Sequence, residues 1–93
     1  MKTPETAAKI EAILRREFAP SLFVLEDQSY MHAGHNPKGG GGHFFVEIRS
    51  KRFNGLAPLA RQRLVMDSVR ELMDADEIHA FSMRCLPESD QKS

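Results

Sequence analysis

The sequence predicts a single α+β domain, in which helices pack on one face of a small mixed three-stranded sheet. Amphipathic helical stretches and short apolar stretches of strand type follow one another in the order αββααβ, and the element after the second strand is a turn or short helix. A chain of 93 residues has room for one compact core. We therefore expect one domain over 1–93, with its core in about 4–87 and a disordered tail at 88–93.

The first helix is predicted to begin near Pro4 and to end near Ala19 and Pro20. Thr3 is a suitable cap, Pro4 suits the first position, and Glu5 favours the positive end of the helix dipole. Apolar residues recur at helical spacing on one side, namely Ala7, Ile10, Ile13, Leu14 and Phe18.

Two strands are predicted next, in "SLFVLEDQS" and "HFFVEIRS". In the second, Phe44, Val46 and Ile48 share one face and are expected to point into the core. About a dozen residues rich in Gly, His, Asn and Pro separate the strands, too many for a tight turn. They predict a mobile loop between antiparallel strands.

The remaining elements are a turn, a helix and a third strand. Asn54 and Gly55 predict the turn, and a helix is expected over about 58–73. Its expected apolar stripe contains Leu59, Met66, Val69 and Met73. After "DADE", the stretch "IHAFSMRC" reads as a strand with alternating faces. We expect His79, Phe81, Met83 and Cys85 on one face, and Ile78 and Ala80 on the other.

Composition limits the functional classes. Hydrophobic residues make up 41% and charged residues 28%, as in ordinary globular domains, so the chain should fold by itself. Thirteen basic residues balance thirteen acidic ones, which removes a general attraction to nucleic acid or anionic lipid. The single cysteine, Cys85, excludes an internal disulfide and suits a reducing compartment. With no membrane-length apolar run and no secretion signal, we expect a cytoplasmic protein without membrane contact.

The four glycines at 39–42 raise the possibility of a phosphate-binding loop. Such loops present converging backbone amides at the start of a helix, whereas a strand follows here. The Lys-Ser/Thr of a P-loop is also absent. We interpret the glycines as a flexible connection.

Histidines provide the candidate metal ligands. His32 and His35 lie three apart in the loop, and neutral imidazole binds zinc, iron and copper. His79 begins the third strand, where partial burial would fix the orientation of its ring. Surface histidines without a role, and a hydrogen-bonded structural histidine at 79, are the alternatives. A shared site requires the loop to fold over the third strand.

A basic region extends from Arg49 to Arg70, where six basic residues accompany Asp67 as the single acid. The side chains of Lys51, Arg52, Arg61 and Arg63 are candidates for contacting DNA phosphates, an acidic partner or glutathione carboxylates. A solvated surface is the alternative interpretation. No nucleophile arrangement or catalytic carboxylate pair is evident, so we expect no enzymatic activity.

Three stretches carry a resemblance to a known family, over roughly residues 8–87: "SYMHAGH", "HFFVEIRSKRFNGLAPLARQRLV" and "ELMDADEIHAFSM". The chain resembles the BolA family, most specifically in Phe53 to Val65 and in "IHAFS" at 78–82. The resemblance implies a fold like the class II KH domain. The helix connection "NGLAPL" lacks the GXXG loop with which KH domains bind RNA.

The resemblance also implies a function in iron–sulfur metabolism. BolA-like proteins pair with monothiol glutaredoxins of the Cys-Gly-Phe-Ser type and share a bridging [2Fe-2S] cluster, for cluster maturation or trafficking. By resemblance His79 is a cluster ligand, and the second ligand from this chain is His32, with His35 next. The glutaredoxin cysteine and glutathione supply thiolates, and no cofactor is expected in the isolated chain. Histidine ligands leave a cluster less negative and can be released by protonation, which suits transfer.

The resemblance implies a second possible role, and this chain departs from the usual family pattern at one position. Bacterial BolA-like proteins are also DNA-binding transcriptional regulators of stress response and cell morphology, which would use the basic turn and helix. The family usually has Arg-His-Arg in the second helix, whereas this chain has Gln62 at the central position. Amide side chains are poor iron ligands, so Gln62 alters whatever contact that histidine makes. The sequence leaves a weak homodimer open.

Overall fold

The structure, a computed structural model, describes residues 3–29 and 42–89 and has the predicted αββααβ order. Its elements are α1 (Thr3–Phe18), β1 (Leu22–Asp27), β2 (Gly42–Ser50), the 3-10 helix η2 (Lys51–Phe53), α2 (Pro58–Ser68), α3 (Arg70–Asp74) and β3 (Ile78–Pro87). No helix within these two ranges is long and apolar enough to cross a lipid bilayer.

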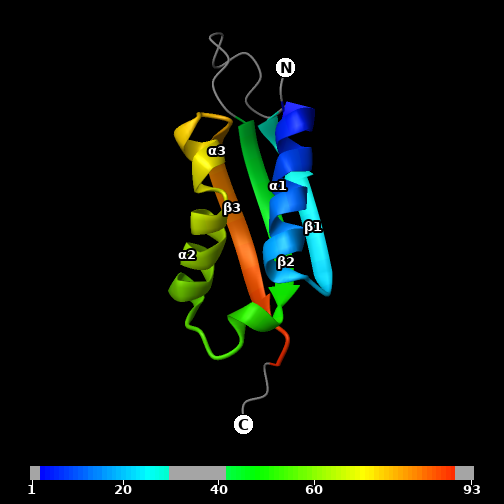
Figure 1. Ribbon diagram of the computed structural model, residues 1–93, viewed down its shortest axis with the longest axis vertical. Helices are drawn as coiled ribbons and strands as arrows, with labels where there is room; N and C mark the ends of the chain where they lie inside the picture. The colour runs from blue at the N-terminus through cyan, green and yellow to red at the C-terminus, as the bar shows by residue number, and fades with distance from the viewer. Residues whose placement is uncertain (1–2, 30–41, 90–93) are drawn as a thin grey trace.

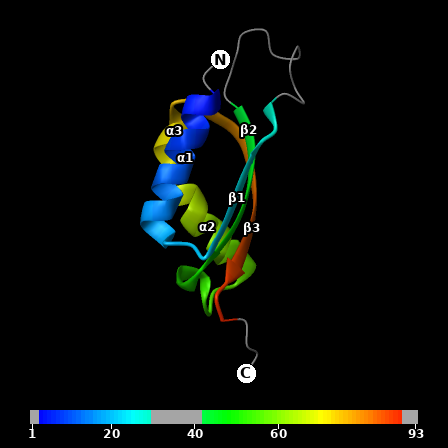
Figure 2. The same cartoon turned by 90° about the vertical axis from the view of Figure 1, so that its right-hand side faces the viewer.

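The sheet has the strand order β1-β2-β3, with β1 antiparallel and β3 parallel to the central β2. Helices α1, α2 and α3 lie on one face of this sheet, and no helix of the described residues covers the opposite face (Figures 1 and 2). The predicted α+β class, the mixed three-stranded sheet and the one-sided helix packing are therefore confirmed.

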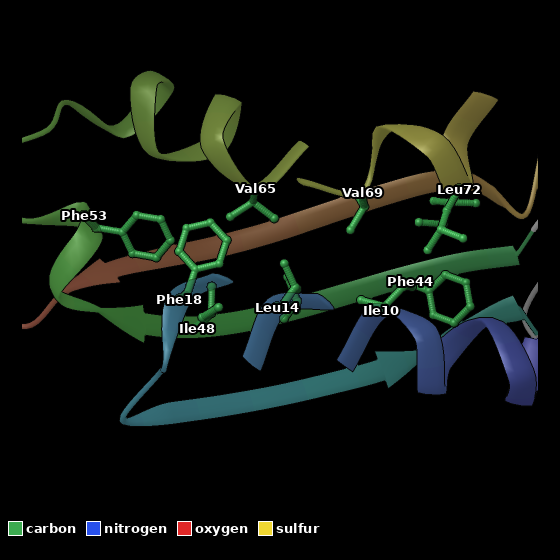
Figure 3. Close-up of a cluster of buried hydrophobic side chains, with 11 residues drawn as sticks. Ile10, Leu14, Phe18, Phe44, Ile48, Phe53, Val65, Val69 and Leu72 are labelled. Carbon is green, nitrogen blue, oxygen red and sulfur yellow. The ribbon is translucent and has the colours of Figure 1, made fainter. Parts of the chain in front are cut away.

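The core lies between the helices and the covered face of the sheet (Figure 3). The predicted inward face of β2 is confirmed, because Phe44, Val46 and Ile48 are at most 1% exposed. The predicted stripe of α1 is also confirmed. Ile10, Leu14 and Phe18 are buried. The remaining buried apolar residues come from later elements: Phe53, Val65, Val69, Leu72 and Ile78.

The single helix expected over 58–73 is wrong in one respect, because it is broken into α2 and α3 at Val69. The Ser68 hydroxyl donates a 2.7 Å hydrogen bond to the Val65 carbonyl oxygen, which competes with the helical backbone pattern. The predicted stripe is also wrong at Leu59, which is 66% exposed, and at Met66, which does not belong to the residues packed against the core, whereas Val69 and Met73 do. The segment α2–α3 contacts the core through Val65, Val69 and Leu72. These residues lie on a different side of the helix from Leu59.

The predicted alternation along β3 is wrong at its first residues. The ladder shifts between Gly42 and His43, which pair with Ile78 and Ala80, so His79 is an extra residue in a β-bulge. The bulge reverses the alternation. Ile78 therefore contacts the core together with the later residues Phe81, Met83 and Cys85.

The turn after η2 and the start of the tail are held by specific contacts. Gly55 has a φ of +78°, a backbone conformation that glycine adopts at low cost, which confirms the turn at Asn54 and Gly55. The Asn54 side-chain oxygen accepts hydrogen bonds from the backbone amides of Glu88 and Ser89, at 2.9 and 3.1 Å. Residues 90–93, the remainder of the predicted tail, lie outside the described residues.

Candidate functional site

His79 occupies the bulge at the start of β3, and its side chain is exposed. The partial burial expected for this histidine is therefore wrong: the extra residue of the bulge lies away from the core. The ring of His79 lies next to that of His43 on β2, with 5.2 Å between the ring centroids and 53° between the ring planes. His43 belongs to the β2 positions that alternate with the buried ones, and thus to the uncovered face of the sheet.

The backbone around these two rings is held on both sides. The Gly42 amide donates to the Glu77 carbonyl oxygen at 3.0 Å, and the His43 amide donates to the Ser29 hydroxyl at 2.9 Å. The Gln28 amide donates to the His43 carbonyl oxygen at 2.7 Å. A Cβ atom at Gly42 would lie 2.7 Å from the Phe44 ring and 2.8 Å from the Ser29 hydroxyl, so this position requires glycine.

Glu77 connects the start of β3 to the helices. Its carboxylate accepts hydrogen bonds from the Lys9 ammonium at 3.0 and 3.2 Å and from the hydroxyl of buried Thr6 at 3.2 Å. Its backbone amide donates to the Leu72 carbonyl oxygen at 2.8 Å. These contacts fix the segment that precedes His79 against both α1 and α3.

The other two predicted metal ligands, His32 and His35, lie outside the described residues. Residues 30–41 connect Ser29 to Gly42 in the sequence. Both connection points belong to the His79 end of the sheet, because Gly42 pairs with Ile78 and Ser29 contacts His43. Ser29 and Gly42, the described residues on either side of 30–41, therefore both lie at the His79 end of the sheet.

Sequence reasoning missed His43 as a member of this site. The signal was present, because residue 43 has the opposite parity to the core-facing residues of β2 and therefore had to lie on the other face. The register that places it next to His79 depends on the bulge, and no local sequence pattern marks the bulge.

The histidines at this end of the sheet fit a metal ion or cluster that takes its remaining ligands from another molecule. Within residues 3–29 and 42–89 no cluster of three or more His, Cys, Asp or Glu side chains could hold a metal ion. A [2Fe-2S] cluster takes four protein or thiol ligands. The single cysteine of the chain, Cys85, lies six residues further along β3, so thiolate ligands for a cluster bound through His79 have to come from another molecule.

The four basic candidates lie at the opposite end of the sheet. Lys51 and Arg52 belong to η2, which follows the last residue of β2, and α2 begins nearby (Figure 1). The Arg61 guanidinium donates to the Cys85 carbonyl oxygen at 3.1 Å. Cys85 is six residues beyond His79 along β3, which corresponds to roughly 20 Å. The metal candidates and the basic candidates therefore form two separate regions, and the neighbouring helix position Gln62 cannot share a metal with His79.

Two of these basic side chains have structural contacts. Arg61 also donates to the Leu56 carbonyl oxygen at 2.8 Å, so it joins the turn before α2 to the end of β3. Arg52 donates to the Glu17 carbonyl oxygen at 2.9 Å and lies over the Phe18 ring. Lys51 and Arg63 are exposed, and neither forms an ion pair within the described part of the chain. They are the basic side chains best placed for an external anion.

Cys85 has the properties of a structural cysteine. Burial raises the pKa of its thiol from 9.0 to about 11, and the Arg61 guanidinium opposes this rise in part. The thiolate is the form that attacks electrophiles and binds metal, so at neutral pH this side chain is unreactive.

The raised pKa of Cys85 predicts a pH dependence of stability. The unfolded thiol ionises near pH 9 and the folded thiol near pH 11. Its contribution to stability is therefore complete below about pH 9 and is lost as the pH rises toward 11. Urea unfolding midpoints between pH 8 and pH 10.5 should fall more steeply for the native protein than for Cys85→Ala. Parallel pH profiles for the two proteins would contradict this assignment.

These features define a small α+β domain with one exposed histidine at a β-bulge, and comparison with known proteins identifies its family. The sequence model of the BolA-like protein family matches residues 14–90. The chain belongs to the BolA-like protein family.

Individual relatives agree with this assignment. Protein BOLA1, chloroplastic, of Arabidopsis thaliana is 40% identical over 81 residues, which cover 83% of this chain and 50% of that protein. The DNA-binding transcriptional regulator BolA of Vibrio cholerae is 39% identical over 74 residues, covering 80% and 67% of the two chains. The chain thus spans half to two thirds of the length of these relatives. Among solved structures, the BolA domain of SufE1 from Arabidopsis thaliana superposes with a TM-score of 0.80 at 30% identity, covering 92% of this chain and 95% of that one.

Proposed function

We propose that this protein is a non-enzymatic iron–sulfur accessory protein, which pairs with a monothiol Cys-Gly-Phe-Ser glutaredoxin in the cytoplasm and shares a bridging [2Fe-2S] cluster with it. The observation that carries the proposal is the placement of His79, an exposed imidazole on a bulge whose flanking backbone is fixed. An exposed and oriented imidazole can enter the coordination sphere of iron held by another protein.

The chain's own residues have defined tasks in this proposal. His79 supplies one neutral nitrogen ligand, and His32 or, next, His35 supplies the second. Glu77, paired with Lys9 and Thr6, holds the start of β3 in position. Cys85 stays outside the site, because it lies six residues along the strand and is held as a neutral thiol. The glutaredoxin cysteine and glutathione provide the sulfur ligands, and the cluster, when bound, is the group passed on to recipient proteins.

The experiment that tests the pairing is a joint reconstitution. The chain and a Cys-Gly-Phe-Ser glutaredoxin are incubated with iron, sulfide and glutathione under anaerobic conditions and then separated by size. The proposal predicts that both proteins elute together with iron and sulfide, with a visible circular dichroism spectrum unlike that of glutaredoxin alone. Separate elution together with the spectrum of glutaredoxin alone would refute the pairing. Single variants His32→Ala and His35→Ala then identify the second ligand by which of them changes the spectrum.

A DNA-binding role is the second candidate, supported by the name of the Vibrio cholerae relative and by the exposure of Lys51 and Arg63. If these side chains contact phosphates, the double variant Lys51→Gln, Arg63→Gln should bind duplex DNA more weakly at every salt concentration. The slope of log affinity against log salt should fall by about 2, because roughly one counterion is released per phosphate contact. Arg84→Gln, on the uncovered face of the sheet, is the matched control. Equal salt slopes for both variants, or no binding at low salt, would eliminate this role.

A further inference from the structure

The rings of His43 and His79 have the spacing of two imidazoles bound to one metal ion. With metal–nitrogen bonds of about 2.0 to 2.1 Å, each ring centre lies about 3.2 Å from the metal, and a tetrahedral angle separates the two centres by about 5.2 Å. The two ring centroids are 5.2 Å apart. Their planes are tilted by 53°, so the rings are not stacked in parallel.

We propose that His43 and His79 form a two-imidazole chelate for a single first-row divalent cation of the Zn²⁺, Ni²⁺ and Cu²⁺ class in the isolated chain. Imidazole nitrogen suits these ions, whereas Mg²⁺ and Ca²⁺ require oxygen ligands. The exposure of His79 leaves the remaining coordination positions open to water or to a ligand from another molecule.

The backbone of the folded chain holds His43 and His79 next to each other. Both histidines belong to neighbouring strands whose pairing fixes their separation, and the bulge places His79 between the pairing positions of Gly42 and His43. The His43 amide and carbonyl are both hydrogen-bonded, to Ser29 and Gln28. Because the backbone positions of both histidines are already fixed in the folded protein, chelation does not have to order the backbone, which lowers its entropic cost.

The chelate shares His79 with the proposed function but differs from it in composition. It uses His43 in place of His32 or His35, and it requires neither glutaredoxin nor sulfide. Metal binding by the isolated chain and cluster sharing with glutaredoxin can therefore succeed or fail independently.

The direct test is titration of the ¹⁵N-labelled full chain with Zn²⁺ alone, followed by NMR of the imidazole nitrogens. Ring nitrogens of His43 and His79 should shift together and reach saturation at one equivalent of Zn²⁺, while those of His32 and His35 keep their positions. A shift of His79 without His43, a simultaneous shift of His32 or His35, or no shift at millimolar Zn²⁺ would overturn the chelate. Because this measurement uses the native chain, it is independent of the folding of any variant.

Variants give the quantitative test by isothermal titration with Zn²⁺ and Ni²⁺. His43→Ala and His79→Ala should each lower the affinity at least 10-fold, with His43→Gln as an alternative if the alanine variant is unfolded. The double variant His32→Ala, His35→Ala is the matched control and should bind within twofold of the native chain. Full affinity in His43→Ala or His43→Gln, or a 10-fold loss in the control, would assign the metal to other residues.

Discussion

Replacing His79 with alanine is expected to remove this chain from any cluster shared with a glutaredoxin. The visible circular dichroism spectrum of the reconstituted mixture should become that of glutaredoxin alone, with at least a 10-fold loss of cluster bound to the mixed complex. The reason is that His79 is the exposed imidazole of the described site, and in residues 42–89 no thiolate is available to replace it.

The fold should survive this substitution. His79 is exposed and lies outside the buried cluster, so the change in unfolding free energy should stay within about 0.5 kcal/mol. Ser82→Ala, an exposed position on the same strand, serves as the control and should keep the native spectrum. A His79→Ala protein that is folded and still gives the native spectrum with glutaredoxin would remove His79 from the ligand set.

Phe44→Ala should cause the largest loss of stability. Phe44 is 1% exposed and belongs to the central strand, with Ile10 and Leu72 around it at one end of the core (Figure 3). Truncating a buried phenylalanine costs about 3 to 5 kcal/mol, because it removes buried apolar area and leaves a cavity. For a domain of this size each kcal/mol lowers the melting temperature by about 4 to 8 °C, so we expect a decrease of roughly 20 °C.

The neighbouring residue supplies a matched control. Phe45 has the same side chain on the same strand but belongs to the uncovered face and is half-buried. Phe45→Ala should therefore lower the unfolding free energy by only about 1 kcal/mol. Thermal unfolding followed by circular dichroism compares the two variants. Equal losses of stability would contradict the placement of the core on one face of the sheet.

Most of the fold was predictable from the sequence, because its strongest patterns are local. The alternation of Phe44, Val46 and Ile48 identified the core face of β2, and the spacing of Ile10, Leu14 and Phe18 identified that of α1. In each case the apolar residues repeat with the period of the helix or strand that contains them, so they share one face, and that face is the buried one.

The sequence-based predictions were wrong where a single contact interrupts the helix or strand that the spacing of apolar residues predicts. The hydrogen bond from Ser68 to Val65 accompanies the break between α2 and α3. The spacing of the apolar residues does not predict this break. The bulge at His79 reverses the faces of β3, and it depends on the pairing with β2. For the same reason the contact between His43 and His79 was missed, since it requires the register of two strands far apart in sequence.

The basic region shows a related limit. Charge and spacing made Arg52 and Arg61 equivalent to Lys51 and Arg63 as candidate contacts for an external anion. The structure separates them, because Arg52 and Arg61 donate to backbone carbonyl oxygens of this chain, whereas Lys51 and Arg63 form no ion pair within residues 3–29 and 42–89. Only tertiary contacts distinguish an arginine that joins two segments from one that is available to a partner.

The most direct test of the central claim, that the imidazole of His79 binds iron, is pulsed electron paramagnetic resonance of the reduced cluster in the mixed complex. The chain is labelled with ¹⁵N-histidine and the glutaredoxin is left unlabelled. We predict ¹⁵N hyperfine coupling of the strength of a directly bound nitrogen in the native complex, and its disappearance from the mixture prepared with His79→Ala. A native complex without such coupling, or one whose coupling is unchanged in His79→Ala, would contradict the account.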